Sequence, residues 1–260
     1  MEKPKVLLTN DDGIHSNGLK CLWESLREVA DLQIAAPMTE QSGAGVGVTF
    51  DRTLQAKPVD HYDHTPAWMI DGKPADCVKL ALHRLLKEKP DFIISGINHG
   101  SNAGRNVLYS GTIGATIEGM MRGIPGIAFS YLCDQTKDFP HVQPYIQKIF
   151  QYILQHPLPA GTILNVNFPH VPPNEIKGCK MARQGYRSWL GTPREEKHFE
   201  SHSEFLFGWD DHLADEHSES DIALLEAGYV TAVPLYIGEL THQSHLDQKK
   251  DTFESHFFLL

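Results

Sequence analysis

The 260-residue chain has few cysteines and no long hydrophobic segment. Its four cysteines are widely separated and form no Cys-x-x-Cys pair, and the sequence contains no Asn-x-Ser/Thr sequon. No apolar run approaches the ~20 residues that a membrane-spanning helix needs. From these absences we expect reduced thiols, a cytoplasmic location and no contact with a membrane.

Basic residues are scarce beside acidic ones, with 23 Lys and Arg against 33 Asp and Glu and a formal charge of −10. Eleven of the acids but only one base lie between residues 195 and 226, so the rest of the chain is neutral. A neutral body lacks the basic stripe that duplex DNA requires, which excludes DNA as a partner. Eleven acids also argue against an apolar interface, so we expect residues 195–226 to form a mobile or solvent-facing arm.

The pattern of apolar residues predicts an α/β fold. Short β-branched runs alternate with stretches of helical spacing, as in βαβ units around a mostly parallel sheet. Prolines at 169, 172 and 173 suggest a boundary between a core, residues 1–170, and a C-terminal extension, residues 171–260, that is not an independent domain. We expect strands at 5–10, 31–36, 91–96, 126–131, 162–168 and 229–235, helices near 19–29, 75–88, 112–122 and 142–156, and a hairpin within 39–71.

Two adjacent carboxylates, Asp11 and Asp12, follow the first predicted strand. Ligands of doubly wound sheets bind where strands end at their carboxyl side. Two neighbouring carboxylates are costly to bury unless they are paired or bound to a cation. Asn10-Asp11-Asp12-Gly13 is also good turn chemistry, so the motif by itself fits a turn and a metal site equally well.

Polar residues follow the next strands in the same way. Ser42 lies among glycines after the second strand, where a hydroxyl and backbone N–H groups can approach an anion. Asn98 and Asn102 follow the strand at 91–96 and offer neutral oxygens to an ion or amide groups to a phosphate. A plain glycine-rich loop is the alternative for this segment.

Ser110 and Gly111 directly precede the helix predicted at 112–122, and Thr112 is its first residue. The N-terminus of a helix exposes free N–H groups that can cradle a phosphate. Simple N-capping by Ser110 or Thr112 is the alternative. Taken together, these features fit metal-assisted phosphoryl chemistry better than four independent turns.

The sequence resembles the SurE (survival protein E) family of metal-dependent nucleoside monophosphate phosphatases. The likeness covers residues 5 to about 132 and continues more weakly through 165–169 and 228–230. It rests on residues 8–14, 36–37, 41–43, 74–78, 95–98, 109–115 and 118–119, together with Asn102. At 218–221 the chain departs from the common Gly-Thr-Asp of the family and keeps only Asp221.

This resemblance implies a Rossmann-like three-layer fold with a C-terminal extension and a hairpin used in oligomerisation, as homodimers or homotetramers. It implies nucleoside 5′-monophosphates, and often 3′-monophosphates, as substrates. It also implies one divalent metal ion, Mg²⁺ or Mn²⁺, held by residues matching Asp11, Asp12, Ser42 and Asn98, and phosphate contacts near Asn102, Ser110, Gly111 and Thr112.

The expected reaction is hydrolysis of the phosphate ester by a water that the metal activates. Residues 110–112 would stabilise charge on the phosphoryl oxygens, and Asp11 or Asp12 would transfer protons. One alternative is a haloacid-dehalogenase-like phosphatase with an Asp nucleophile, although that class uses Asp-x-Asp and the acids here are adjacent. The other is a non-catalytic nucleotide- or metal-binding module that uses the same loops.

Overall fold

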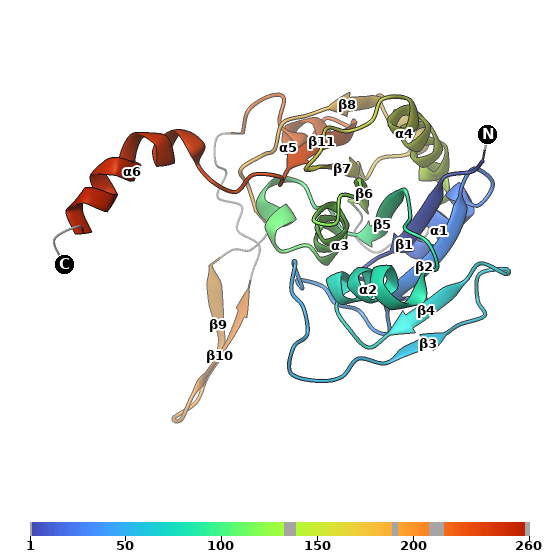
Figure 1. The fold of residues 1–260 in the computed structure, drawn as a ribbon, viewed down its shortest axis with the longest axis horizontal. Coiled ribbons are helices and arrows are strands. Elements are labelled where there is room, and N and C mark those ends of the chain that lie inside the picture. Colours follow the sequence, from blue (N-terminus) through green and yellow to red (C-terminus); the bar gives the residue numbers. More distant parts are fainter. Residues whose placement is uncertain (1, 133–138, 189–191, 208–215, 258–260) are drawn as a thin grey trace.

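A nine-stranded sheet forms the centre of the computed structural model, which describes residues 2–132, 139–188, 192–207 and 216–257 (Figure 1). The strand order is β3-β4-β2-β1-β5-β6-β7-β11-β8. The six neighbouring strands from β4 through β2, β1, β5 and β6 to β7 are parallel. Strand β3 runs antiparallel to β4, and β11 runs antiparallel to β7. The mostly parallel α/β sheet predicted from the sequence is therefore confirmed.

The elements follow one another in the order expected of βαβ units. The strands are β1 (Lys5–Thr9), β2 (Asp31–Pro37), β3 (Ala56–Pro58), β4 (Ala67–Ile70), β5 (Phe92–His99), β6 (Gly126–Tyr131), β7 (Thr162–Phe168), β8 (Cys179–Met181), β9 (Pro193–His198), β10 (Ser203–Phe207) and β11 (Val230–Tyr236). The helices are α1 (Asn17–Leu26), α2 (Pro74–Leu80), α3 (Gly111–Met120), α4 (Gln143–Gln155), α5 (Asp221–Glu226) and α6 (Gln243–Phe257).

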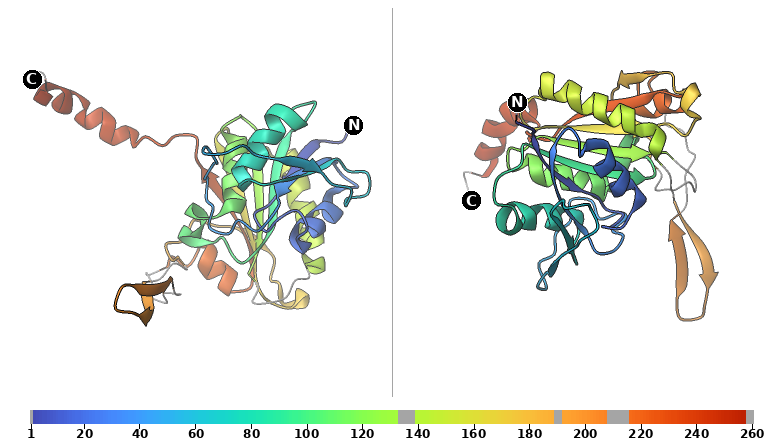
Figure 2. Two further views of the ribbon diagram at one scale, coloured as in Figure 1. Left: turned by 90° about the horizontal axis from the view of Figure 1, so that it is seen from below. Right: turned by 90° about the vertical axis from the view of Figure 1, so that its right-hand side faces the viewer.

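Helices cover both faces of the sheet (Figure 2). Helices α1 and α4 contact each other and bury their apolar residues against one face, in a cluster that includes Leu22 and Phe150. Helices α2 and α3 contact each other and cover the other face, where Val78 and Ala115 are fully buried. Burial of apolar side chains on both faces is what makes the parallel strands read as continuous apolar runs in the sequence.

The direction of strand addition reverses at β1, which lies between β2 and β5. A reversal of this kind opens a crevice at the carboxyl ends of the two strands beside it. Strand β5 continues to His99, three residues beyond the predicted end at 96, so Asn98 lies in the end of the strand rather than in a loop. Helix α2 ends earlier than the predicted helix 75–88, because it passes into a π-helical turn, Ala81–Leu85, and Leu86 is extended.

The acidic segment 195–226 divides into parts with different surroundings. Its first part forms the antiparallel hairpin of β9 and β10, which is solvent-exposed as expected. Its last part does not match the expectation of an exposed arm, because Asp221 is fully buried, Leu224 and Leu225 are buried, and α5 contacts β11. Backbone N–H groups surround the Asp221 carboxylate and offset the cost of burying it. Residues 208–215 of the predicted arm lie outside the described residues.

The β9–β10 hairpin and helix α6 both project away from the sheet and its helices (Figure 1). Helix α6 has no buried residue. In the described part of the chain, no helix is long and apolar enough to cross a membrane.

Candidate active site

A pocket of about 450 Å³ opens at the carboxyl ends of β1 and β5, within the range of about 300–1,000 Å³ that small ligands occupy in proteins. Five of the eight site residues predicted from the sequence line this pocket. The predicted residues that line it are Asp11, Ser42, Asn98, Asn102 and Ser110. Three segments far apart in the sequence therefore meet in one cavity.

Asp11 and Asp12 lie at the strand switch beside β5. Asp11 is almost fully buried, and its Oδ1 accepts a hydrogen bond of 2.5 Å from the Thr112 hydroxyl. Asp12 is half-buried and accepts the backbone N–H of His99 at 3.2 Å. Burial raises the pKa of Asp11 to about 7, with repulsion from Asp12 adding to the effect, and burial raises the pKa of Asp12 to about 6.

Helix α3 starts against Asp11 because Gly111 has no side chain. A Cβ at Gly111 would lie 2.8 Å from the Asp11 Cβ and 3.0 Å from its Oδ2. The partial positive charge of the helix N-terminus therefore faces a carboxylate, which favours the ionised form. Further along α3, a Cβ at Gly119 would lie 2.4 Å from the Ile93 side chain, so this glycine lets the helix pack closely on the sheet.

The predicted donors fit a hard divalent cation. Among the described residues, no three His, Cys, Asp or Glu side chains group to hold a metal, so a cation here needs neutral oxygens beside the two carboxylates. The Asn98 amide nitrogen donates to the carbonyl of Gly100, which leaves its side-chain oxygen for a cation. The Ser42 hydroxyl donates a hydrogen bond to the Glu40 carboxylate, so the lone pairs of its oxygen remain available to a cation. Carboxylate, amide and hydroxyl oxygens are the ligands that Mg²⁺ and Mn²⁺ prefer.

Asn102 belongs to a buried polar network that was not predicted from the sequence. Its amide nitrogen donates to Ser130 at 2.8 Å and to Thr112 at 3.5 Å. Its backbone N–H donates to Asn167, and its carbonyl accepts from Asn165. Asn165 and Asn167 alternate on β7, so a signal was present as two amides on one face of an otherwise apolar strand.

The three residues predicted to bind phosphate from α3 occupy different positions. Ser110 lines the pocket and also caps the helix, since its Oγ accepts the N–H of Ile113. Gly111 and Thr112 lie behind Asp11, and the Thr112 side chain is fully buried with its hydroxyl bonded to that carboxylate. Their contact with a phosphate stays a prediction.

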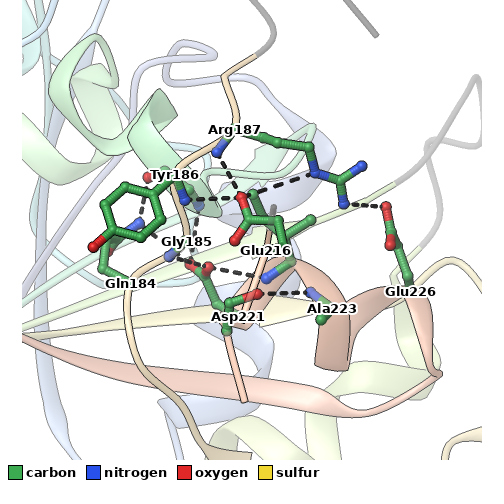
Figure 3. Close-up of polar contacts among 11 residues, drawn as sticks. Gln184, Gly185, Tyr186, Arg187, Glu216, Asp221, Ala223 and Glu226 are labelled. Atoms are coloured by element: carbon green, nitrogen blue, oxygen red, sulfur yellow. Dashed lines mark hydrogen bonds and ion pairs between the residues drawn. The ribbon is translucent and has the colours of Figure 1, made fainter. Parts of the chain in front are cut away.

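The C-terminal segment supplies a second wall of the pocket, made of Arg187, Ser188, Ile222, Leu225 and Glu226. Asp221 joins this wall to the Asn102 loop, because its Oδ2 accepts the N–H of Gly104 at 3.0 Å. Its Oδ1 accepts the N–H of Gly185 at 2.8 Å (Figure 3). Burial raises the pKa of Asp221. From the sequence, Asp221 is identified only as the residue kept from a family motif. This wall is not predicted, because its residues share no spacing with the predicted site.

Comparison with known proteins agrees with this architecture. The model of the Survival protein SurE family matches residues 6–191. The 5′-nucleotidase SurE of Protochlamydia amoebophila is 45% identical over 97% of this chain and 98% of its own length. That of Cytophaga hutchinsonii is 39% identical over 94% and 95%.

A solved structure shows the same fold. The crystal structure of the SurE protein from Aquifex aeolicus superposes with a TM-score of 0.82 at 33% identity, covering 96% of this chain and all of that one. Likeness of this extent in both sequence and structure leaves one conclusion: the chain belongs to the SurE family.

Proposed function

We propose that the chain is a metal-dependent 5′-nucleotidase that hydrolyses nucleoside 5′-monophosphates, and also 3′-monophosphates, to nucleoside and phosphate. The observation that carries this proposal is the convergence of Asp11, Ser42 and Asn98 on one pocket beside the N-terminus of α3. The names of the relatives from Protochlamydia and Cytophaga support the same reaction class.

Asp11, Asp12, Ser42 and Asn98 would hold one Mg²⁺ or Mn²⁺. Such a cation supplies Lewis-acid polarisation of a phosphoryl oxygen and favours ionisation of a water molecule. Asp11 or Asp12 would accept the proton of the attacking water, since burial raises the pKa of each towards neutrality.

The remaining residues of the pocket orient the substrate in this proposal. The Ser110 hydroxyl and the first N–H groups of α3 face the developing charge on the phosphoryl oxygens. Asn102 is held by four hydrogen-bonding partners, so its position is set before substrate arrives.

Phosphate release from a panel of nucleoside monophosphates, with Mg²⁺, Mn²⁺ or a chelator, tests the function. We expect release with a metal and loss of at least about two orders of magnitude in Asp11→Asn, because a carboxylate ligand is removed. Lys57→Gln, an exposed change on β3, is the control. Nucleotide binding without release under either metal would instead establish a binding module, and a trapped phosphoaspartate would establish an Asp nucleophile.

The same proposal includes self-association through the projecting elements. Phe205, Leu206 and Phe207 on β10 are 62%, 52% and 68% exposed, and Phe253 and Phe257 are exposed on α6. Adjacent apolar side chains exposed to this degree are typical of interaction surfaces. For the hairpin, this proposal replaces the sequence expectation that the acids of residues 195–226 argue against an apolar interface. We expect a dimer or tetramer by light scattering and a lower mass for the double variant Phe205→Ser, Phe207→Ser. An unchanged mass would exclude the hairpin from the interface.

A further inference from the structure

The wall formed by the C-terminal segment takes no part in the phosphate chemistry described above. It lines the same pocket with two apolar side chains, Ile222 and Leu225, and two charged ones, Arg187 and Glu226. We propose that this wall is the nucleoside subsite and that Arg187 recognises the base. The proposal rests on the proposed function, because it needs a substrate that carries a base.

The backbone around Arg187 is held independently of its side chain. Glu216 Oε1 accepts the N–H groups of Tyr186 at 2.8 Å and of Arg187 at 2.6 Å, while Asp221 holds Gly185 (Figure 3). The Arg187 carbonyl accepts the N–H of Arg105, three residues beyond Asn102. The segment is therefore fixed to the loop that carries Asn102, and the guanidinium projects from a rigid support.

The charges of this wall favour a neutral group over a second phosphate. The Arg187 guanidinium bonds to Glu226, and its Nε lies 3.9 Å from Glu216 Oε1. The single positive charge of Arg187 is thus outnumbered by the two carboxylates of Glu226 and Glu216. A phosphate placed there would experience net electrostatic repulsion. A base carries no charge at neutral pH, so it avoids this penalty.

The same side chains match the chemistry of a base. Arg187 provides only donors and Glu226 provides only acceptors, and the edge of a base presents both kinds of group. Arg187 is about four-fifths buried at its side chain, where hydrogen bonds to a charged donor discriminate most strongly. Ile222 and Leu225 supply apolar surface for the ring face, as in most small-molecule pockets.

The test compares Arg187→Met with the wild type on three substrates: the best nucleoside monophosphate of the panel, ribose 5-phosphate and phenyl phosphate. We expect kcat/KM for the nucleotide to fall at least about tenfold relative to phenyl phosphate, since a charged hydrogen bond is lost. The loss should appear mainly in KM and should be larger for the nucleotide than for ribose 5-phosphate. Equal losses on all three substrates would overturn the assignment to the base.

Two further variants make the outcome decisive. Arg183 lies in the same segment, is exposed and does not line the pocket. In Arg183→Met the ratios of kcat/KM between the substrates should therefore stay within about twofold of the wild type. Glu226→Gln changes an exposed side chain with little effect on folding, and it should lower the same nucleotide preference as Arg187→Met. If Arg187→Met does not fold, Glu226→Gln alone decides, and an unchanged preference overturns the subsite.

The failures of the two proposals remain distinct. A wild-type protein that releases no phosphate from any substrate contradicts the nucleotidase function itself. A wild type that is active, with variants that keep its preference for the nucleotide over phenyl phosphate, contradicts only the nucleoside subsite.

Discussion

At the scale of single residues, the Thr112 hydroxyl orients Asp11 from behind through its 2.5 Å hydrogen bond. We expect Thr112→Val to weaken Mn²⁺ binding by about 10- to 100-fold, the usual effect of losing a partner that orients a metal ligand. Titration calorimetry measures the change. Thr116→Val is the matched control, because Thr116 is equally buried on α3 but donates to the carbonyl of Ile113. Equal effects of the two substitutions would contradict an orienting role for Thr112.

The acid–base properties of Asp11 and Asp12 lead to a pH dependence of metal binding. Their pKa values are raised to about 7 and about 6, and a cation binds the ionised carboxylates. Protons therefore compete as the pH falls through these values, and affinity should drop by up to about tenfold per pH unit for each proton displaced. Calorimetry in buffers of different ionisation enthalpy counts the protons released. A constant affinity between these two pKa values would argue against ligation by these residues.

At the scale of elements, the close approach of α3 to β1 and β5 depends on two glycines with different neighbours. Gly111→Ala would place a Cβ against Asp11, whereas Gly119→Ala would place one against Ile93 in the core. Each should lower the unfolding free energy by about 1–3 kcal/mol through overpacking. Only Gly111→Ala should also weaken Mn²⁺ binding in the folded protein. Urea denaturation measures the loss of stability, and calorimetry measures Mn²⁺ binding. Wild-type Mn²⁺ affinity in Gly111→Ala would show that Asp11 moves aside without losing its role.

At the scale of the whole molecule, Asp221 connects segments that are more than a hundred residues apart in the sequence. Both of its oxygens accept N–H groups, from Gly104, Gly185 and Ile222 and from the amide of Gln184. Asp221→Asn turns one acceptor into a donor that faces those N–H groups, so we expect a loss of about 1–3 kcal/mol of unfolding free energy. Urea denaturation checks this. Glu219→Gln, an exposed neighbour, should stay close to the wild type.

The net charge of −10 is likewise unevenly distributed over the molecule. Acidic residues of the β9–β10 hairpin face solvent, while Glu216 and Asp221 bind backbone N–H groups beside the pocket. The acidic residues of this one segment therefore differ in environment: some are solvated, and others accept hydrogen bonds from the backbone. Composition averages over them, and only their contacts tell them apart.

Much of the central architecture could be predicted because local patterns specify it. The strands at 126–131 and 162–168 match β6 and β7, since apolar runs between turn residues form strands wherever two faces are covered. Asp11, Ser42, Asn98 and Ser110 could be proposed as one site, because each follows a predicted strand or precedes a predicted helix and strand ends meet at one edge of a sheet.

Other features depend on contacts between distant parts of the chain. Local sequence patterns specify the alternation of strands and helices, the position of the acidic window and the polar residues at the strand ends. In contrast, three features arise from long-range contacts: Asn165 and Asn167 support Asn102, Asp221 is buried, and Arg187 and Glu226 share the pocket with Asp11. Local periodicity shows which face of an element is apolar and therefore buried. The hydrogen-bonding partner of a buried polar side chain, however, comes from a distant segment, and no local pattern identifies that segment.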